Sequence, residues 1–294
     1  MSLDIDGKPS VLIPIAPGTN RNEELALAFH AAGAVTAQVP LQQLRNGDVK
    51  LVDHQLLALP GGFSYGDALG AGRLLGLDLS GWFAEQLLEA REREMPIIGI
   101  CNGFQALVKA GLLPGGVEAS PQAGIGRSST GAADTVVATL TDNAKGRFEC
   151  RWVNLLPAAA HSPWMAELTQ NSEAGSQPQM IRCPVAHGEG RFVSSDLAAI
   201  EAADLVALRY CKADGTLAAG SYPDNPNGSG GDVAGIVDPT GLVLGLMPHP
   251  EDHVFERQDP QRRRRSAAGQ DAEGNPSGNC LGLFRSGVQA ITSS

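Results

Sequence analysis

The sequence predicts an α/β protein whose mostly parallel central sheet is covered by helices on both faces. In the first half of the chain, short apolar runs alternate with amphipathic segments at the spacing of consecutive β-α units. Strands of a parallel sheet are buried on both faces and read as continuous apolar runs, as VLIPIA, LLAL and PIIGI do here. No linker-like segment interrupts the chain, so residues 1–294 are expected to form a single domain.

The elements of the first half are marked by start and stop signals. Asn20 is expected to cap the helix in RNEELALAFHAAG, whose leucines and alanines form one stripe and which Gly33 ends. The run Leu56–Leu59 is broken by the Pro60-Gly61-Gly62 turn. The predicted order is strand 11–16, helix 21–33, strands 34–41 and 56–59, helix 81–94, strand 96–100 and helix 102–111.

The second half is richer in strand segments and ends on a helix. Asp232–Gly245 contains an Asp-Pro-Thr-Gly turn and predicts a hairpin. The polar segment Glu256–Gly278 is long for a loop in a compact domain and is expected to be functional or mobile. Within it, the basic run 262–265 is either solvated or a contact for a phosphate or an acidic partner. The other expected elements are strands in 147–155 and 180–193, a loop at 214–231 and a closing helix at 280–291.

Charge and cysteine content exclude several classes of function. With 32 acidic and 22 basic residues, the net charge is -10, which does not favour binding to nucleic acid or anionic membranes. Five widely spaced cysteines without a CxxC pair argue against a disulfide framework and against a metal site such as zinc. The sequence shows neither a secretory leader nor an apolar run of about 18 residues. A soluble, cytoplasmic protein is therefore expected.

A candidate nucleophile stands between a strand and a helix. The segment PIIGICNGFQAL places Cys101 in a G-x-C-x-G pattern with Gly99 and Gly103. A nucleophile elbow needs small residues at these two positions, because larger side chains would collide with neighbouring backbone. The start of the following helix also favours a thiolate. The alternative is that Cys101 is a small buried hydrophobe beside two ordinary glycines.

An oxyanion formed at this elbow would need backbone donors. The N–H of Asn102 follows the nucleophile and points to where an oxyanion would form. The loop PGGFSYGD follows a strand that should neighbour the elbow strand, and its glycines allow a close approach of the backbone. We expect the second donor to be the N–H of Gly62 or Phe63.

The candidate base and its orienting group lie in LMPHPE. His249 comes just past an apolar strand, at the sheet edge where catalytic groups of parallel α/β proteins gather. It can accept the cysteine proton and later donate it to a leaving amine. Glu251, two residues on, can bond the other imidazole nitrogen and select its tautomer. A histidine at a strand end is more often structural, and His253 is a competitor for the Glu251 carboxylate.

Two further segments predict a substrate pocket. Gln105 lies one helical turn after Cys101, on the same helix face. In PVAHGEGRF, a strand enters a glycine-rich bend, and His187, Gly188 and Glu189 offer backbone and side-chain partners for an amino-acid head group. An ordinary turn with an unrelated histidine is the alternative for this bend.

Taken together, GICNGFQAL, PGGFSYGD, PVAHGEGRF, DNPNGS and GLMPHPE resemble the glutaminase subunits of phosphoribosylformylglycinamidine synthase, within the class I, triad-type glutamine amidotransferases. The resemblance implies a three-layer α/β/α sandwich. It implies that Cys101 attacks the side-chain amide of L-glutamine, that His249 protonates the departing ammonia, and that Glu251 orients His249. Gln105 and the backbone around His187 and Gly188 would hold the substrate.

The resemblance also implies partners in purine biosynthesis. Ammonia would pass to an ATP-dependent synthetase subunit that converts formylglycinamide ribonucleotide to its amidine, and a small third subunit would bridge the two. Because the chain lacks GxxxxGK[ST], ATP and magnesium are expected on the synthetase, and no cofactor is expected here. The alternatives are a stand-alone thiol hydrolase or peptidase of the same fold, and a redox sensor or chaperone that uses the elbow cysteine without His249 and Glu251.

Overall fold

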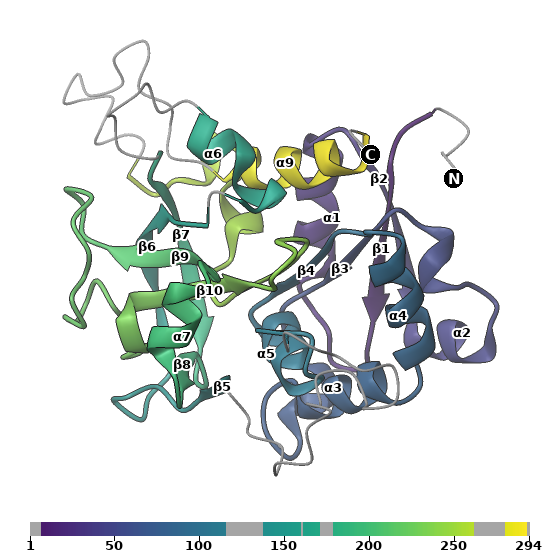
Figure 1. Ribbon diagram of the computed structural model, residues 1–294, viewed down its shortest axis with the longest axis horizontal. Helices are drawn as coiled ribbons and strands as arrows, with labels where there is room; N and C mark the ends of the chain where they lie inside the picture. Colours follow the sequence, from purple (N-terminus) through teal and green to yellow (C-terminus); the bar gives the residue numbers. More distant parts are fainter. Residues whose placement is uncertain (1–6, 116–137, 160, 171–178, 262–279, 293–294) are drawn as a thin grey trace.

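The computed structural model describes residues 7–115, 138–159, 161–170, 179–261 and 280–292 (Figure 1). In this part of the chain, nine strands form a central sheet with the order β2-β1-β3-β4-β11-β10-β9-β6-β7, and β5 pairs with β8 in a small second sheet. The strands are β1 (Ser10–Ile15), β2 (Val35–Pro40), β3 (Leu56–Leu59), β4 (Ile97–Ile100), β5 (Ala138–Thr141), β6 (Glu149–Pro157), β7 (Ile181–His187), β8 (Arg191–Ser194), β9 (Val206–Cys211), β10 (Val233–Val237) and β11 (Val243–Leu246).

The central sheet is mixed, with one parallel half and one antiparallel half. The pairings from β2 through β1, β3 and β4 to β11 are parallel, as the β-α spacing predicts. The pairings of β11 with β10, β10 with β9, β9 with β6 and β6 with β7 are antiparallel. Of these antiparallel pairs, β10 and β11 are joined by a short hairpin turn. β11 is therefore the strand at which the two halves meet.

Helices cover both faces of the sheet and give the three layers (Figure 1). α1 and α9 pack together on one face, where the rings of Phe29 and Phe284 meet edge-on at a centroid distance of 5.3 Å. α3, α4 and α5 lie on the other face, and α5 contacts both β3 and β4. The helices are α1 (Asn22–Ala31), α2 (Leu41–Asn46), α3 (Arg73–Ser80), α4 (Ala84–Glu92), α5 (Asn102–Lys109), α6 (Ala166–Gln170), α7 (Leu197–Ala202) and α9 (Leu281–Thr292).

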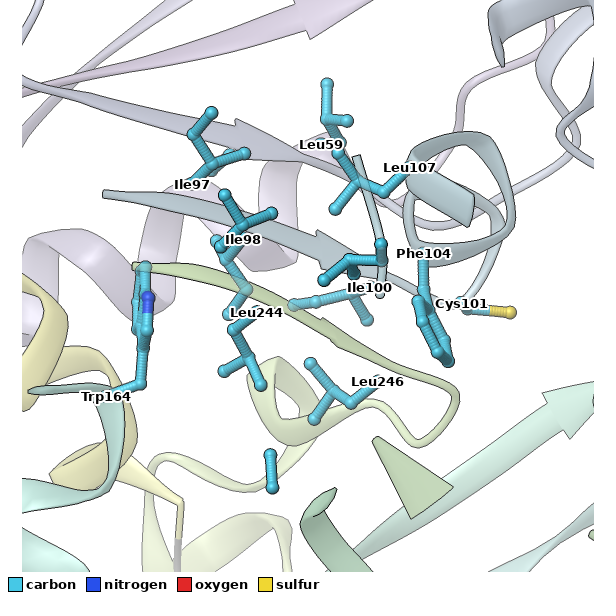
Figure 2. Close-up of a cluster of buried hydrophobic side chains, with 14 of the residues drawn as sticks. Leu59, Ile97, Ile98, Ile100, Cys101, Phe104, Leu107, Trp164, Leu244 and Leu246 are labelled. Atoms are coloured by element: carbon cyan, nitrogen blue, oxygen red, sulfur yellow. The ribbon is translucent and has the colours of Figure 1, made fainter. Parts of the chain in front are cut away.

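The core under the elbow consists of branched aliphatic side chains from adjacent parallel strands. Ile97, Ile98 and Ile100 of β4 and Leu244 and Leu246 of β11 are fully buried or nearly so. Figure 2 shows these side chains packed together, while the sulfur of Cys101 points away from the cluster. Burying one such side chain stabilises a fold by about 1.5–3 kcal/mol. The cluster therefore gives the nucleophile a rigid base.

Most of the predicted elements are present, with three differences in the first half. α2, which begins at Leu41 directly after β2, was not predicted. α3 was not predicted, because glycines at both ends weaken its helical signal. The Asn20 cap prediction is wrong, since the helix begins after Arg21, which makes no side-chain cap. The predicted hairpin is confirmed, and Gly241 N–H closes its turn on Asp238 O at 2.8 Å. Of the predicted loop 256–278, residues 256–258 form a short 3-10 turn, and residues 262–278 lie outside the described residues.

Candidate active site

Cys101 occupies a strained turn between β4 and α5. Its backbone has φ 49° and ψ -104°, a conformation that L-residues rarely adopt. A Cβ on Gly103 would lie 2.2 Å from Leu59 O, and one on Gly99 would lie 2.7 Å from Gly103 C. Both neighbours are backbone atoms that cannot move aside. The prediction that a nucleophile elbow requires glycine at these two positions is thus met by the geometry.

The register of β4 and β11 brings the cysteine and the histidine to the same sheet edge. Leu246 pairs with Ile100, so the two parallel strands end side by side. Cys101 N–H donates to Leu246 O at 2.8 Å, which joins the elbow to the end of β11. His249 follows three residues later, and its own N–H donates to Pro184 O of β7 at 2.8 Å. Three distant stretches of chain therefore converge here.

His249 and Glu251 form the predicted imidazole–carboxylate pair. The distance from His249 Nδ1 to Glu251 Oε1 is 2.7 Å, and both residues are buried, with relative exposures of 3% and 1%. His249 Nε2 is buried without a hydrogen-bond partner in the described part of the chain. The nitrogen that faces away from Glu251 is therefore available to the cysteine and to a leaving group.

Charge controls the protonation of His249. Burial alone would lower its pKa, but the charges of Glu251 and Cys101 outweigh burial and hold the pKa of His249 well above its usual value. The imidazolium form is therefore favoured beside the sulfur. A protonated His249 is the acid that a departing amine needs.

Gly61 lets the histidine ring approach the elbow. A Cβ on Gly61 would lie 2.8 Å from His249 Cε1 and 3.5 Å from Cys101 Cβ. The missing side chain thus leaves the space in which the ring packs against the elbow. The sequence predicted this glycine only from a close approach of the loop backbone. The structure adds a second reason, which is the space that the His249 ring occupies.

The same loop is bonded to the start of α5. The Asn102 side chain accepts from Ser64 Oγ at 2.5 Å and donates to Asp67 Oδ1 at 2.8 Å. Of the two predicted second donors, Phe63 N–H already donates to Gly18 O at 3.3 Å. Gly62, with φ 120° in a conformation that favours glycine, is therefore the better candidate beside the Asn102 N–H.

Gln105 and Glu189 contact each other across the predicted pocket. Gln105 Nε2 donates to Glu189 O at 2.6 Å, and the Glu189 carboxylate lies 3.3 Å from Ala71 N–H, just before α3. These contacts join the elbow helix, the bend after β7 and the start of α3 into one wall. Contact of Gln105 or Glu189 with glutamine stays a prediction.

The His187 ring supports the bend from inside. Its Nδ1 lies 3.1 Å from Asn143 Oδ1, and its Nε2 lies 3.5 Å from Asn227 Nδ2. Burial, followed by the charge of His249, lowers the pKa of His187 to about 4, so the ring is neutral. Both ring nitrogens thus face buried amides, and contact of the His187 side chain with an amino-acid head group stays a prediction. The bend nonetheless lies over the nucleophile, because Cys101 Sγ is 3.8 Å from Ala186 O.

Comparison with known proteins identifies the family. The family profile of the CobB/CobQ-like glutamine amidotransferase domain matches residues 8–289. The chain belongs to this glutamine amidotransferase family. A relative from Treponema denticola, named phosphoribosylformylglycinamidine synthase subunit PurQ, is 39% identical over 97% of this chain and 99% of its own length. A relative of the same name from Dehalococcoides mccartyi is 39% identical over 86% of this chain and 89% of its own length.

Solved structures agree with this amidotransferase assignment. The structure of PurLQS from Thermotoga maritima matches with a TM-score of 0.63 and 30% identity, covering 97% of this chain and 98% of that one. A glutamine amidotransferase from Thermotoga maritima, with a TM-score of 0.50 and 16% identity, supports the fold alone. The α/β/α sandwich with its nucleophile elbow is therefore the fold of this amidotransferase.

Sequence reasoning missed the polar groups that hold the amidotransferase site together. Asn143 donates to His187 O at 2.8 Å, and Asn227 donates to Gly190 O at 2.8 Å. Both side chains are buried. Asn227 lies in the predicted loop 214–231, where the DNPNGS motif was its only signal, and Asn143 lies in a segment for which no element was predicted. The predicted competitor His253 does not take the Glu251 carboxylate, because its Nδ1 bonds Arg182 O.

No helix within the described ranges is long and apolar enough to cross a lipid bilayer.

Proposed function

We propose that this chain is the glutaminase subunit of phosphoribosylformylglycinamidine synthase. It would hydrolyse L-glutamine through a cysteinyl thioester and supply ammonia for purine biosynthesis. The observation that carries the proposal is the buried His249–Glu251 pair beside the elbow Cys101. The chain also matches a relative named as that subunit over almost the whole length of both proteins. Such relatives favour this function over a stand-alone hydrolase or peptidase of the same fold.

The first half-reaction begins at the cysteine sulfur. The Cys101 thiolate attacks the side-chain carbonyl carbon of glutamine, and the carbonyl oxygen takes up the negative charge. We assign the stabilisation of this oxyanion to the backbone N–H groups of Asn102 and Gly62; loss of one such donor typically costs about 3–4 kcal/mol. His249 gives its proton to the amide nitrogen, the C–N bond breaks, and ammonia leaves. A γ-glutamyl thioester remains on Cys101.

The second half-reaction releases glutamate. Neutral His249, oriented by Glu251, removes a proton from water, which attacks the thioester carbonyl. The C–S bond then breaks, glutamate leaves, and the thiolate and the imidazolium are restored. Because Gly61 has no side chain, the His249 ring can lie close to the elbow in both steps.

The ammonia requires an acceptor that this chain does not supply. We place ATP, magnesium and the formylglycinamide ribonucleotide on a synthetase subunit, and we add a small bridging subunit to the complex. The Thermotoga maritima relative, whose structure is that of PurLQS, supports assembly with a synthetase. The five cysteines, which are all unpaired, support a cytoplasmic location.

The deciding experiment is reconstitution of the chain with its synthetase. The purified complex should form the amidine from glutamine, ATP and formylglycinamide ribonucleotide. With Cys101→Ala, glutamine-dependent formation should be lost, while formation from ammonium chloride should stay close to wild type. Loss of both activities would leave complex assembly in question, and retention of the glutamine-dependent activity would refute the proposed role of Cys101.

A second measurement separates this function from a stand-alone hydrolase. Ammonia release by the chain alone should be slow, and addition of the synthetase with its nucleotide substrates should stimulate it. Full activity without the synthetase would favour the hydrolase instead.

A further inference from the structure

An ion pair joins the turn that carries Glu251 to the first helix. Arg21, at the start of α1, pairs with Asp252, the residue after Glu251 in the short 3-10 turn Pro250–His253. The two side chains are 231 positions apart in sequence and are only partly exposed, at 29% and 24%. A second, weaker contact joins Arg21 to Glu24 at 3.6 Å. Arg21 is therefore the cation of a local group of carboxylates.

Two buried polar atoms at this place have no hydrogen-bond partner among the described residues. One is Arg21 Nε, a donor, and the other is Glu251 Oε2, an acceptor. Glu251 thus uses only one of its two oxygens, the one bonded to His249. Nearby positive charge offsets the cost of burying a carboxylate oxygen that has no hydrogen-bond partner. Arg21 supplies such a charge from another element.

The neighbouring charges respond to one another. Burial would lower the pKa of Arg21, but the charges of Asp252 and Glu251 raise it. Burial and the charge of Glu251 raise the pKa of Asp252, while Arg21 opposes this rise. The ionisable groups on and against this turn include those beside Glu251, those at the start of α1, those of β7, and two more from the elbow and the segment before α9. They are His249, Asp252 and His253; Arg21 and Glu24; Arg182 and Cys183; and Cys101 and Cys280.

We propose that Arg21 is a positioning residue for the triad: its charge, held by Asp252, offsets the second carboxylate of the turn and thereby tunes the protonation of His249 beside Glu251. The proposal rests on the function proposed above and adds a fourth and fifth residue to the same site. Neither Arg21 nor Asp252 touches the reacting atoms. Their effect reaches the chemistry through the protonation of His249.

Because Arg21 and Asp252 carry opposite charges, removing one or the other should shift the pH profile in opposite directions. Removing the cation with Arg21→Gln makes the site more negative, so the pKa of His249 should rise. Removing the anion with Asp252→Asn makes the site more positive, so the pKa of His249 should fall. The pH profile of kcat/KM for glutamine hydrolysis should therefore move to higher pH in the first variant and to lower pH in the second, by about half a unit or more at low ionic strength.

The double variant and a conservative variant complete the test. Arg21→Gln combined with Asp252→Asn should return the profile towards wild type, and Arg21→Lys should keep it. Arg209→Gln is the control, because it breaks another ion pair between two elements, that of half-buried Arg209 with exposed Glu201 at 2.9 Å between β9 and α7. That variant should leave the profile in place. Shifts of the same sign in both single variants, or lower activity with an unchanged profile, would overturn the proposal.

A measurement that does not need turnover tests the role of Arg21 independently of the proposed glutaminase function. NMR titration of the His249 ring, assigned by comparison with His249→Gln, should show the same two opposite shifts. If the wild type releases no ammonia from glutamine but the ring titrates as described, the proposed function fails and the role of Arg21 stands. If glutamine is hydrolysed and the ring titrates identically in all variants, only the role of Arg21 fails.

Discussion

Two buried histidines at the site differ in protonation because their neighbours differ. His249 has Glu251 and the Cys101 sulfur beside it, and these raise its pKa well above the usual value. His187 has only neutral amides at its ring nitrogens, so burial and the positive His249 lower its pKa to about 4. Charge therefore favours the protonated form of His249, and burial favours the neutral form of His187.

The Glu251 carboxylate should be required for turnover. Glu251→Gln keeps the shape but removes the charge and presents the wrong hydrogen-bonding group to His249 Nδ1, so kcat for glutamine hydrolysis should fall by about 10²- to 10⁴-fold. Steady-state ammonia release measures the change. Asp238→Asn, at a buried carboxylate in the turn between β10 and β11, is the control and should leave kcat of the folded protein near wild type. A Glu251→Gln enzyme within tenfold of wild type would contradict the assigned role.

His187 should make the fold sensitive to acid. Its folded pKa is depressed to about 4 against about 6.5 in the unfolded chain, so the unfolded state binds the extra proton between these values. The free energy of unfolding should therefore fall as pH drops from 6.5 to 4, by about 3 kcal/mol from this group. Urea unfolding at pH 6.5 and 4.5 measures the loss. His187→Gln should show a smaller loss, and an equal loss in both proteins would rule out this contribution.

At the scale of elements, the sequence predicted those parts of the site that are formed by residues close together in the chain. The elbow and the His-Pro-Glu segment could be predicted because each is short and has its own pattern. The Asn143–His187 contact spans 44 positions and the Arg21–Asp252 contact 231 positions, and no local pattern marks them. α3 escaped prediction for a different reason, its flanking glycines. Contacts between elements are therefore what the sequence alone did not provide.

Because the Pro60–Asp67 loop packs against the His249 ring, activity should be sensitive to a side chain at Gly61. Gly61→Ala would push its new Cβ against His249 Cε1, 2.8 Å away, and displace the ring from the elbow. Since a misplacement of about 1 Å can cost about 10²-fold in rate, kcat/KM for glutamine should fall by about 10- to 100-fold. Thermal unfolding should change much less.

A second glycine gives the control for this variant. At Gly230 a Cβ would meet its nearest neighbour at an ordinary 3.6 Å, so Gly230→Ala should retain activity. Equal kcat/KM values for Gly61→Ala and wild type would show that the ring does not need this space.

At the scale of the whole molecule, the site lies where the two halves of the sheet meet. The parallel half provides the elbow at the end of β4, and β11 provides the strand that leads to His249. The antiparallel half brings β7, whose Pro184 and Ala186 carbonyls contact His249 N–H and the Cys101 sulfur. The β-α periodicity predicted the parallel half, while the order of the antiparallel strands depends on pairings between distant segments. The triad therefore depends on both halves of the sheet.

In the proposed reaction the sulfur of Cys101 forms a covalent bond with the substrate. Rapid acid quenching of the enzyme during turnover of isotope-labelled glutamine, followed by peptide mass spectrometry, measures this directly. We predict a γ-glutamyl thioester on the peptide that contains Cys101, more of it in His249→Asn if loss of the base slows hydrolysis more than acylation, and none in Cys101→Ala. Label on another residue, or ammonia release by Cys101→Ala at the wild-type rate, would contradict the mechanism.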